Sequence, residues 1–337
     1  MRVAVFGTKS YDRQFLTAAN AAFGHDLTFL EPRLDTATAP LAAGHEGVCV
    51  FVNDRLDAAV LDRLGALGVR TVALRCAGYN GVDLRAADRL GIAVVRVPAY
   101  SPEAVAEFTI GLLLSLDRQI HRAWARVREN NFALDGLIGR NLAGRTAGVI
   151  GTGRIGALVA RTLCLGFGCT VLASDVVEDA ALIAMGVRYV PRETLLAESD
   201  IVTLHCPLTP DTRHLIDAAA LERARPGVQI VNTSRGALID TAALIAALKS
   251  HKVGGVALDV YEQEADLFFE NLSDEIVQDD VFQRLLTFPN VLVTGHQAFL
   301  TEEALTAIAE TTLRSLADAG AGRALVNRVT AAVVVGG

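Results

Sequence analysis

The sequence predicts an α/β protein made of two doubly wound parallel-sheet domains. Short apolar runs rich in β-branched residues alternate with amphipathic stretches, and this alternation restarts after a long helical pattern that begins at Ser101. Strands that alternate with helices form a parallel sheet covered on both faces. The length of 337 residues suits two domains of about 150 residues each. A hydrophobic content of 51% with 20% charged residues excludes a disordered chain.

The first hundred residues contain one complete strand–helix alternation. Its amphipathic stretches predict helices, and its short apolar runs predict strands. The expected strands are 3–6, 27–30, 48–52, 72–74 and 92–97, and the expected helices are 11–22, 56–67 and 84–90. We interpret this part as one small domain with an open sheet.

A long helix is expected next. Ser101 suits the N-cap, Pro102 suits the first helical position and Glu103 complements the helix dipole. The pattern continues to about Glu129, which is roughly 40 Å at 1.5 Å per residue. Such a helix could carry the chain from one domain to the next, so a hinge is expected just before it.

A second alternation follows Gly144. The expected strands are 146–150, 170–174, 201–205, 230–232, 255–258 and 291–293, with helices at 155–166 and 238–249. A last helix from Thr301 to about Ala319 and a short apolar tail are expected to return to the first domain. The prediction is a discontinuous substrate domain, 1–100 plus 299–337, around an inserted domain, 101–298. The acidic stretch from Glu262 to Asp280 is interpreted as a solvated connection for most of its length.

Charge and cysteine usage limit the possible partners. The formal charge of −7 supplies no basic surface that could follow phosphates, which argues against nucleic acid as a partner. The N-terminal apolar run is too short for a signal peptide, and no run of about 18 apolar residues could span a membrane. A cytoplasmic protein with no membrane partner is therefore expected. The five cysteines include no Cys-x-x-Cys pair, so we predict reduced thiols and no metal site.

A glycine-rich motif predicts a dinucleotide site of the Rossmann type. Gly151, Gly153 and Gly156 form G-x-G-x-x-G between an expected strand and an expected helix, and Asp175 follows 19 residues beyond Gly156. The glycines would make the turn, admit the pyrophosphate and let the helix pack closely, while the helix N-terminus faces the phosphates. A carboxylate at Asp175 would bind both ribose hydroxyls and repel a 2′-phosphate, which favours NAD over NADP.

Three polar residues after predicted strands could handle a substrate of a nicotinamide enzyme, whose cofactor carries the hydride. Arg235 could hold a carboxylate through two parallel hydrogen bonds. His296 could give a proton to a carbonyl oxygen. Glu264 could orient the His296 imidazole and favour its imidazolium form. Taken singly, each has an ordinary alternative: a surface turn for the arginine, an interfacial role for the histidine and a solvated position for the acid.

The motifs together resemble the D-2-hydroxyacid dehydrogenase family, most closely its D-lactate dehydrogenase branch. The resemblance extends from Arg75-Cys76-Ala77-Gly78-Tyr79-Asn80 to Thr294-Gly295-His296-Gln297-Ala298-Phe299-Leu300-Thr301. It implies two Rossmann-like or flavodoxin-like domains with a cleft that closes on the substrate. It also implies reversible NADH-dependent reduction of pyruvate to D-lactate, with Arg235 on the substrate carboxylate, His296 as proton donor and Glu264 as its partner. The segment 261–270 resembles the lactate-type version.

The resemblance implies further contacts. For the substrate, a small 2-keto or 2-hydroxy acid, these are Gly78, Tyr79, Tyr100, Phe51 and Phe299. For NAD they are Arg154, Ile155, Cys206, Pro207, Thr212, Thr233, Ser234 and Asp259, of which Asp259 would also tune the histidine. A homodimer or homotetramer is implied, with the helix from Ser101 as the contact. The sequence departs from the commonest family pattern at Gly81, Cys206 and Asn271, which leaves side-chain preference and cofactor affinity open.

Two alternatives remain open at this point. One is the same reaction on a bulkier 2-keto acid, because pocket size cannot be derived from a sequence. The other is a non-catalytic NAD-sensing binding protein, since corepressors that resemble these dehydrogenases can retain the same residues. The absence of a basic patch or a Pro/Ser-rich tail counts mildly against that second alternative.

Overall fold

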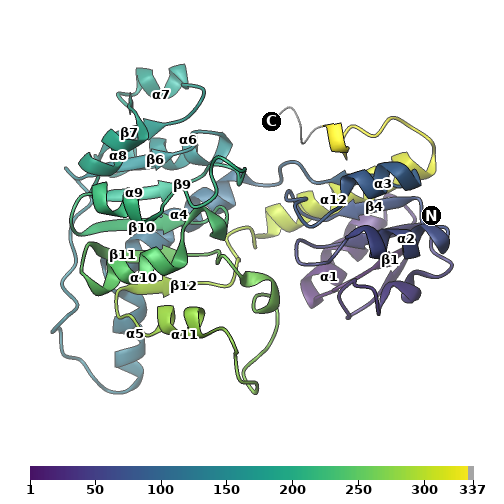
Figure 1. Cartoon of the computed structure of the whole chain (residues 1–337), viewed down its shortest axis with the longest axis horizontal. Helices are drawn as coiled ribbons and strands as arrows, with labels where there is room; N and C mark the ends of the chain where they lie inside the picture. The colour runs from purple at the N-terminus through teal and green to yellow at the C-terminus, as the bar shows by residue number, and fades with distance from the viewer. Residues whose placement is uncertain (333–337) are drawn as a thin grey trace. The chain divides into compact units, whose positions relative to one another are not determined.

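The chain forms two compact α/β units, each with its own sheet. A computed structural model describes residues 1–332 (Figure 1). One unit comprises Met1–Ser101 and the segment that starts at Leu300, and the other comprises Pro102–Phe299. Both sheets are built on parallel strands with helices on both faces, which confirms the predicted fold class.

The first unit contains a six-stranded sheet in the order β13-β5-β4-β3-β1-β2. All neighbouring strands are parallel except β13, which runs antiparallel to β5. The strands are β1 (Arg2–Val5), β2 (Asp26–Phe29), β3 (Gly47–Val50), β4 (Thr71–Leu74), β5 (Ala93–Arg96) and β13 (Arg328–Val329). The helices are α1 (Ser10–Asn20), η1 (Ala39–Ala42), α2 (Ala58–Ala66), α3 (Leu84–Leu90) and α12 (Glu302–Gly320).

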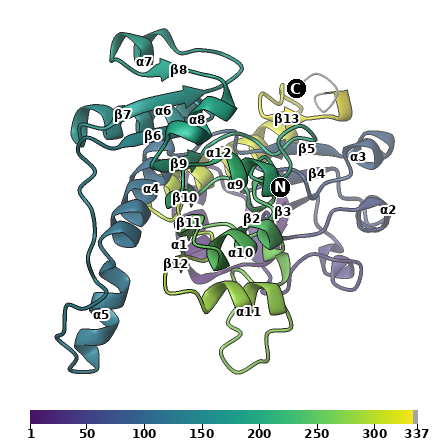
Figure 2. The ribbon, with the colours of Figure 1, turned by 60° about the vertical axis from the view of Figure 1, so that its left-hand side comes forward.

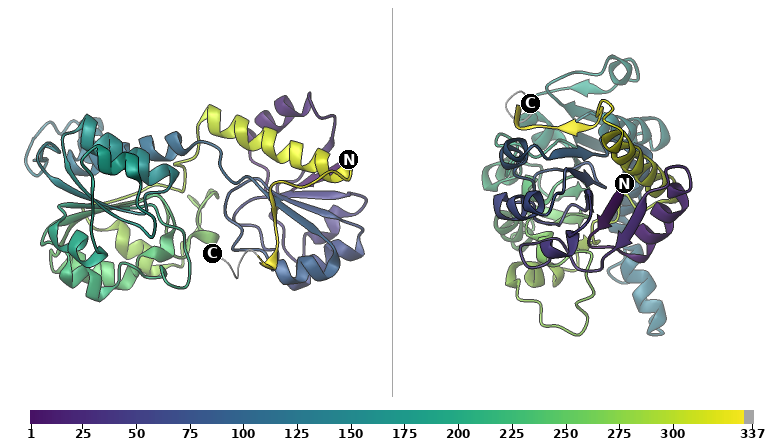
Figure 3. Two further views of the ribbon diagram at one scale, coloured as in Figure 1. Left: turned by 90° about the horizontal axis from the view of Figure 1, so that it is seen from above. Right: turned by 90° about the vertical axis from the view of Figure 1, so that its right-hand side faces the viewer.

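Successive side chains along these strands point to opposite faces of the sheet. Val3 and Val5 of β1 pack with α1 and α12, whereas Ala4 and the following Phe6 pack with α2 and α3. Figure 3 shows helices on both faces of this sheet. Asp57 caps α2 by accepting a hydrogen bond from the Val60 N–H at 3.0 Å. Helix α12 and strand β13 belong to this unit, and residues 333–337 of the expected apolar tail lie outside the described residues.

The second unit contains a seven-stranded parallel sheet in the order β12-β11-β10-β9-β6-β7-β8. From β6 the chain adds strands outward on one side, then returns to β9 and adds strands on the other. Ligands of such sheets bind beyond the carboxyl ends of the strands at this reversal. The strands are β6 (Thr146–Ile150), β7 (Thr170–Ser174), β8 (Arg188–Tyr189), β9 (Ile201–Leu204), β10 (Val228–Asn232), β11 (Val253–Leu258) and β12 (Val291–Val293).

Helices cover both faces of this second sheet (Figure 2), and buried apolar side chains fill the layer on each face. One face packs against α4 (Pro102–Asp117), α6 (Arg154–Arg161), which continues as the π-helical turn η2 (Thr162–Gly166), and α7 (Ala180–Ala184). The other packs against α8 (Arg192–Glu198), α9 (Ala218–Arg223), α10 (Thr241–Lys249) and α11 (Asp280–Leu286). Short 3-10 turns, η3 (Gly236–Leu238) and η4 (Glu264–Asp266), follow β10 and β11.

The prediction of one helix from Ser101 to about Glu129 is wrong, because the helix breaks in the middle. Helix α4 ends at Asp117, Gln119 adopts a left-handed conformation with φ of 53°, and α5 runs from Ile120 to Arg128. Asp117 is buried and its carboxylate accepts hydrogen bonds from the Arg145 side chain at 3.0 Å and the Arg140 N–H at 3.1 Å. These bonds hold the end of α4 against the unit, whereas α5 has no buried residue.

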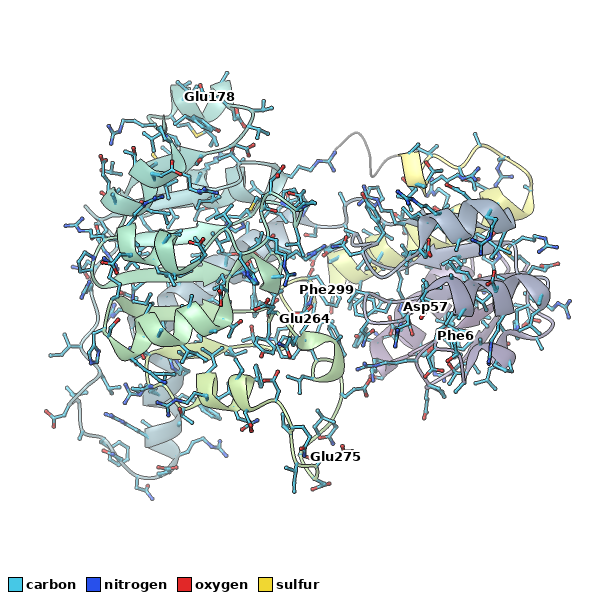
Figure 4. All side chains as sticks on the ribbon, viewed as in Figure 1. Phe6, Asp57, Glu178, Glu264, Glu275 and Phe299 are labelled. Atoms are coloured by element: carbon cyan, nitrogen blue, oxygen red, sulfur yellow. The ribbon has the colours of Figure 1, made fainter. Side chains whose placement is uncertain are left out.

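The acidic connection is solvated over most of its length, as expected, with one exception. Glu275 lies at the tip of the loop between η4 and α11 (Figure 4). Phe268, in contrast, is only 7% exposed, and its ring meets that of Phe282 on α11 at a centroid distance of 5.9 Å. This apolar contact secures the part of the connection that follows Glu264.

The remaining expectations concern cysteines and membranes. All five cysteines are free thiols; Cys164 is partly buried and the other four are buried. Within residues 1–332, no helix combines the length and the apolar character needed to cross a membrane.

Candidate active site

The glycine-rich turn follows β6 and contains two positions that only glycine can occupy. Gly151 has φ of +89°, and a Cβ there would lie 2.5 Å from the backbone nitrogen of Cys206. A Cβ on Gly156 would overlap the carbonyl of Gly151. At Gly153, the N-cap of α6, a Cβ would meet nothing within 4 Å. The backbone before α6 is therefore open to a phosphate group, which the unpaired N–H groups of the first helical turn can bind.

Asp175 stands at the end of β7 with its side chain exposed and oriented by the glycine-rich turn. Its Oδ2 accepts hydrogen bonds from the Thr152 N–H at 2.5 Å and the Thr152 hydroxyl at 3.2 Å. The Tyr189 hydroxyl donates to Thr152 Oγ1 at 2.8 Å. Thr152 and Tyr189 were not predicted from the sequence, although Thr152 lies inside the glycine-rich motif. The exposed carboxylate fits the two ribose hydroxyls of a dinucleotide.

The segment after β9 presents uncharged groups beside this turn. Burial lowers the pKa of His205 to about 3, and its Nε2 lies 2.8 Å from Thr203 Oγ1. Burial raises the pKa of the Cys206 thiol to about 11. Thr212 donates a hydrogen bond to the Pro207 carbonyl at 2.7 Å, which folds this loop onto itself. At neutral pH the imidazole and the thiol are therefore both neutral.

Arg235 follows β10 in a turn held by a buried asparagine. Asn232 donates to the Arg235 carbonyl at 2.8 Å and accepts from the Ser234 N–H at 3.0 Å. Thr233 shares a hydrogen bond with Thr109 of α4 at 2.7 Å, and Ser234 donates to the Cys206 carbonyl at 2.8 Å. The Arg235 guanidinium donates through Nη1 to the Ser234 carbonyl at 2.7 Å. Its other N–H groups have no acceptor within residues 1–332, so a carboxylate can bind them.

Gly236 brings the Arg235 turn against the segment after β11. A Cβ on Gly236 would overlap the carbonyl carbon and oxygen of Tyr261. Only glycine lets the two backbones approach this closely. The turn that carries Arg235 and the segment that carries Glu264 are thus packed directly on each other.

His296 and Glu264 form a hydrogen-bonded pair. His296 Nδ1 lies 2.8 Å from Glu264 Oε1, and Glu264 Oε2 accepts a hydrogen bond from the Tyr261 N–H at 2.9 Å. Because a carboxylate only accepts, Nδ1 of the imidazole carries the proton in this bond. Nε2 then faces away from Glu264, and it has no hydrogen-bond partner among the described residues.

Aromatic rings flank the imidazole. The rings of Phe269 and Phe299 have centroids 5.6 Å and 6.5 Å from that of His296, and Phe299 meets it edge-on. Glu264 and Phe299 lie on the same side of the second unit (Figure 4). The side chains of His296 and Glu264 are only 18% and 22% exposed, so the pair is shielded from bulk water while still reachable.

Asp259 is fully buried and holds the loop that presents His296. Its Oδ1 accepts from the Thr294 hydroxyl at 2.5 Å and the Gln297 N–H at 2.9 Å, and its Oδ2 accepts from the Ala298 N–H at 2.8 Å. The Asp259 carbonyl accepts from the His296 N–H at 2.7 Å, and His296 itself has φ of 54°. Burial raises the pKa of Asp259, and these hydrogen bonds oppose the rise. Asp259 therefore acts through the loop backbone, while its predicted contact with the cofactor stays a prediction.

The predicted substrate residues Phe51, Gly78, Tyr79 and Tyr100 belong to the first unit. Phe51 follows β3, and its N–H donates a hydrogen bond to Oδ2 of the buried Asp54 at 2.6 Å. The guanidinium carbon of Arg75 lies over the Phe51 ring, 5.1 Å from the ring centroid. Arg75 is 1% exposed and paired with Asp12 at 3.0 Å. This buried cluster was not predicted from the sequence, because its members come from three separate segments. No group of three or more metal-binding side chains occurs in the described part of the chain.

Comparison with known proteins gives a consistent result for nearly the whole chain. Residues 110–298 match the family model "D-isomer specific 2-hydroxyacid dehydrogenase, NAD binding domain". The D-lactate dehydrogenase of Escherichia coli is 53% identical over 98% of this chain and 100% of its own length. The solved apo-structure of the Escherichia coli enzyme superposes with a TM-score of 0.90 at 51% identity, covering 98% of this chain and 100% of that one.

A second solved structure carries the cofactor. D-lactate dehydrogenase from Aquifex aeolicus, complexed with NAD and lactic acid, superposes with a TM-score of 0.84 at 33% identity, covering 95% of this chain and 96% of that one. NAD is therefore the cofactor, and the open backbone at Gly153 and the exposed carboxylate of Asp175 fit it. The chain belongs to the NAD-dependent D-2-hydroxyacid dehydrogenase family.

Proposed function

We propose that this protein is a D-lactate dehydrogenase that reduces pyruvate with NADH and catalyses the reverse reaction. The His296–Glu264 pair carries the proposal, because it holds an imidazole in one orientation. Its Nε2, which has no partner among residues 1–332, can then bind a substrate oxygen. The relative from Escherichia coli, 53% identical, bears the name D-lactate dehydrogenase, which supports pyruvate as the substrate.

Arg235, His296 and Glu264 have separate roles in the proposed reduction of a carbonyl group. Bound NADH supplies the hydride to the carbonyl carbon. The Arg235 guanidinium binds the substrate carboxylate through N–H groups that have no acceptor within residues 1–332. His296 donates a proton from Nε2 to the carbonyl oxygen, and Glu264 stabilises the imidazolium that must exist before this transfer. In the reverse direction the neutral imidazole takes the proton from the hydroxyl of D-lactate.

The chain also has groups that would hold NAD and exclude water. The N–H groups before α6 would bind the pyrophosphate, and Asp175 would accept hydrogen bonds from the adenosine ribose. Phe269 and Phe299 flank the imidazole and keep water from it. Gly78 and Tyr79 as carboxylate ligands, and Phe51 and Tyr100 near the substrate, remain predictions from the family resemblance.

Self-association through α5 and the loop after it is part of the proposal. Trp124 on α5 is 64% exposed, and the loop residues Phe132 and Leu134 are 70% and 78% exposed. Helix α5 stands away from the sheet of its unit (Figure 2). Large apolar side chains gathered on one segment are typical of an interface. A homodimer or homotetramer is expected by light scattering, and a monomer at micromolar concentration would contradict this part.

Replacement of His296 by alanine tests the proposed chemistry. We expect kcat for pyruvate reduction to fall by about 10²- to 10⁴-fold, as for a lost general acid. The affinity for NADH, measured by fluorescence titration, should stay within a factor of about two. The exposed His251 provides the control: His251→Asn tolerates its φ of 59° and should keep full activity. A His296→Ala enzyme with normal kcat would remove the proton-donor role.

A further inference from the structure

In the turn after β4, two consecutive backbone N–H groups have no acceptor in the described part of the chain. Those of Gly78 and Tyr79 donate no hydrogen bond to any residue within 1–332, although both residues are partly buried. A backbone N–H is a strong donor, and in native proteins it pairs with the protein, with water or with a ligand. Two free neighbouring donors are therefore available to an anionic ligand.

In the same two peptide units, each carbonyl oxygen accepts a hydrogen bond from a side chain. Arg96 Nη1 donates to the Ala77 carbonyl at 2.8 Å, and Cys76 Sγ donates to the Gly78 carbonyl at 3.2 Å. The described chain has no cis peptide bond. In a planar trans peptide the carbonyl and the following N–H point in opposite directions. Arg96 thus sets the direction of the Gly78 N–H, and Cys76 sets that of the Tyr79 N–H.

Arg96 is anchored by the sheet on one side and by an aromatic ring on the other. It ends β5, in register with Leu74 of β4, and its own N–H donates to the Asn327 carbonyl at 3.1 Å. Its guanidinium carbon lies 5.0 Å from the centre of the Tyr79 ring. A charged donor on a peptide carbonyl also polarises that peptide, which makes its N–H a stronger donor.

We propose that Arg96 and Cys76 are positioning residues that orient the Gly78 and Tyr79 N–H groups for the substrate carboxylate, and that Arg96 also polarises the first of them. This inference rests on the proposed function, since it assigns the two N–H groups to the carboxylate of a 2-keto acid. Arg96 and Cys76 act through the peptide units and do not touch the substrate.

Kinetics of matched variants test the inference. Arg96→Met keeps the apolar stem of the side chain but removes its hydrogen-bond donors. The control is Arg89→Met, which removes an exposed arginine of the same unit whose Nη2 lies 3.1 Å from Asp62 Oδ1. We expect the KM for pyruvate to rise by about tenfold in Arg96→Met, the effect of roughly one hydrogen bond to a charged group. Arg89→Met should leave the KM unchanged. Arg96→Lys should lie between wild type and Arg96→Met, because it keeps the charge without the planar fork.

Two further readouts separate positioning from a general structural role. The Kd of oxamate, a pyruvate analogue with the same carboxylate, should rise in the enzyme–NADH complex by the same factor as the KM. The Kd of NADH and the melting temperature should stay close to wild type. The second pair, Cys76→Ala and Cys76→Ser, keeps the test valid if Arg96→Met does not fold. Only Cys76→Ala should raise the KM, because serine retains a donor for the Gly78 carbonyl.

The outcomes distinguish this inference from the proposed function. A wild-type protein that reduces pyruvate, with KM and oxamate Kd in Arg96→Met and Cys76→Ala within about twofold of wild type, overturns the inference alone. A wild-type protein that neither reduces a 2-keto acid nor binds oxamate overturns the proposed function and the inference with it. A raised KM with an equally raised NADH Kd and a lowered melting temperature also overturns it, in favour of a purely structural role.

Discussion

His296 Nδ1 lies 2.8 Å from Oε1 of Glu264, and the second carboxylate oxygen of Glu264 is held by the Tyr261 N–H at 2.9 Å. Both ends of the carboxylate are therefore occupied, which fixes the plane of the imidazole. Gly236 packs its backbone on Tyr261, so the turn that carries Arg235 is tied to the same segment. His296 and Arg235 are in this way positioned by one piece of backbone.

Glu264→Gln should slow the reaction without moving the histidine. The amide oxygen of glutamine can still accept from Nδ1, but a neutral partner no longer stabilises the imidazolium. We expect kcat to fall by about 10- to 100-fold while the Kd of NADH is unchanged. Glu275→Gln, at the exposed loop tip, is the matched control. Equal kcat values for the two variants would show that the charge of Glu264 is not used.

Arg235→Lys should weaken substrate binding more than it slows turnover. An ammonium group cannot reproduce the two parallel hydrogen bonds of a guanidinium to a carboxylate. We expect the KM for pyruvate to rise by at least about tenfold. The measurement is the steady-state kinetics of Arg235→Lys compared with those of Arg188→Lys. Arg188 is an exposed arginine whose Nη2 lies 3.5 Å from Glu198 Oε2. A pyruvate KM equal to that of wild type would count against Arg235 as the carboxylate ligand.

Asp175→Ala should narrow the preference for NADH over NADPH. The exposed carboxylate is held beside the glycine-rich turn by Thr152, where it would bind ribose hydroxyls and repel a 2′-phosphate. The measurement is the ratio of kcat/KM for the two cofactors, with Asp274→Ala in the exposed acidic loop as the control. If that ratio is the same in Asp175→Ala and wild type, Asp175 does not select the cofactor.

His205 should make the protein less stable in mild acid. Its pKa in the folded state is about 3, below the ordinary value of 6.5, so between these values the unfolded chain binds more protons. The free energy of unfolding therefore decreases as pH falls from about 6.5 toward 3, and at pH 5 the loss is at most about 2 kcal/mol. His205→Gln removes this proton uptake. Urea unfolding at pH 7.5 and pH 5 should show a smaller loss for the variant, and identical losses would contradict the assignment.

Buried strands were the most predictable elements of the fold. β6 and β7 have the bounds expected from their apolar runs, because each is covered on both faces and needs a continuous run of such residues. Short helices were not predicted: α7 and α9 have five and six residues, too few for a clear periodicity, although Asp179 and Asp217 cap them. The break after α4 depends on the buried contact between Asp117 and Arg145, which lie 28 residues apart.

The chemical groups of the candidate site were easier to predict than the residues that hold them. His296 and Glu264 follow strands that end at the same edge of a sheet, and the structure pairs them. Thr152 and Arg96 were missed because the sheet brings their partners, the Asp175 carboxylate and the Ala77 carbonyl, near them. Arg96 and Ala77 meet only because β5 lies beside β4 in a particular register. Such contacts leave no motif in the sequence.

The most direct test of the account is the oxidation of NADH by the purified protein with pyruvate, followed by absorbance and by stereospecific analysis of the product. We expect rapid oxidation, D-lactate rather than L-lactate as the product, and slower turnover with bulkier 2-keto acids and with NADPH. Faster turnover with a bulkier 2-keto acid would replace the proposed substrate within the same family. Binding of NADH without turnover of any 2-keto acid would contradict the account and favour a non-catalytic NAD-binding role.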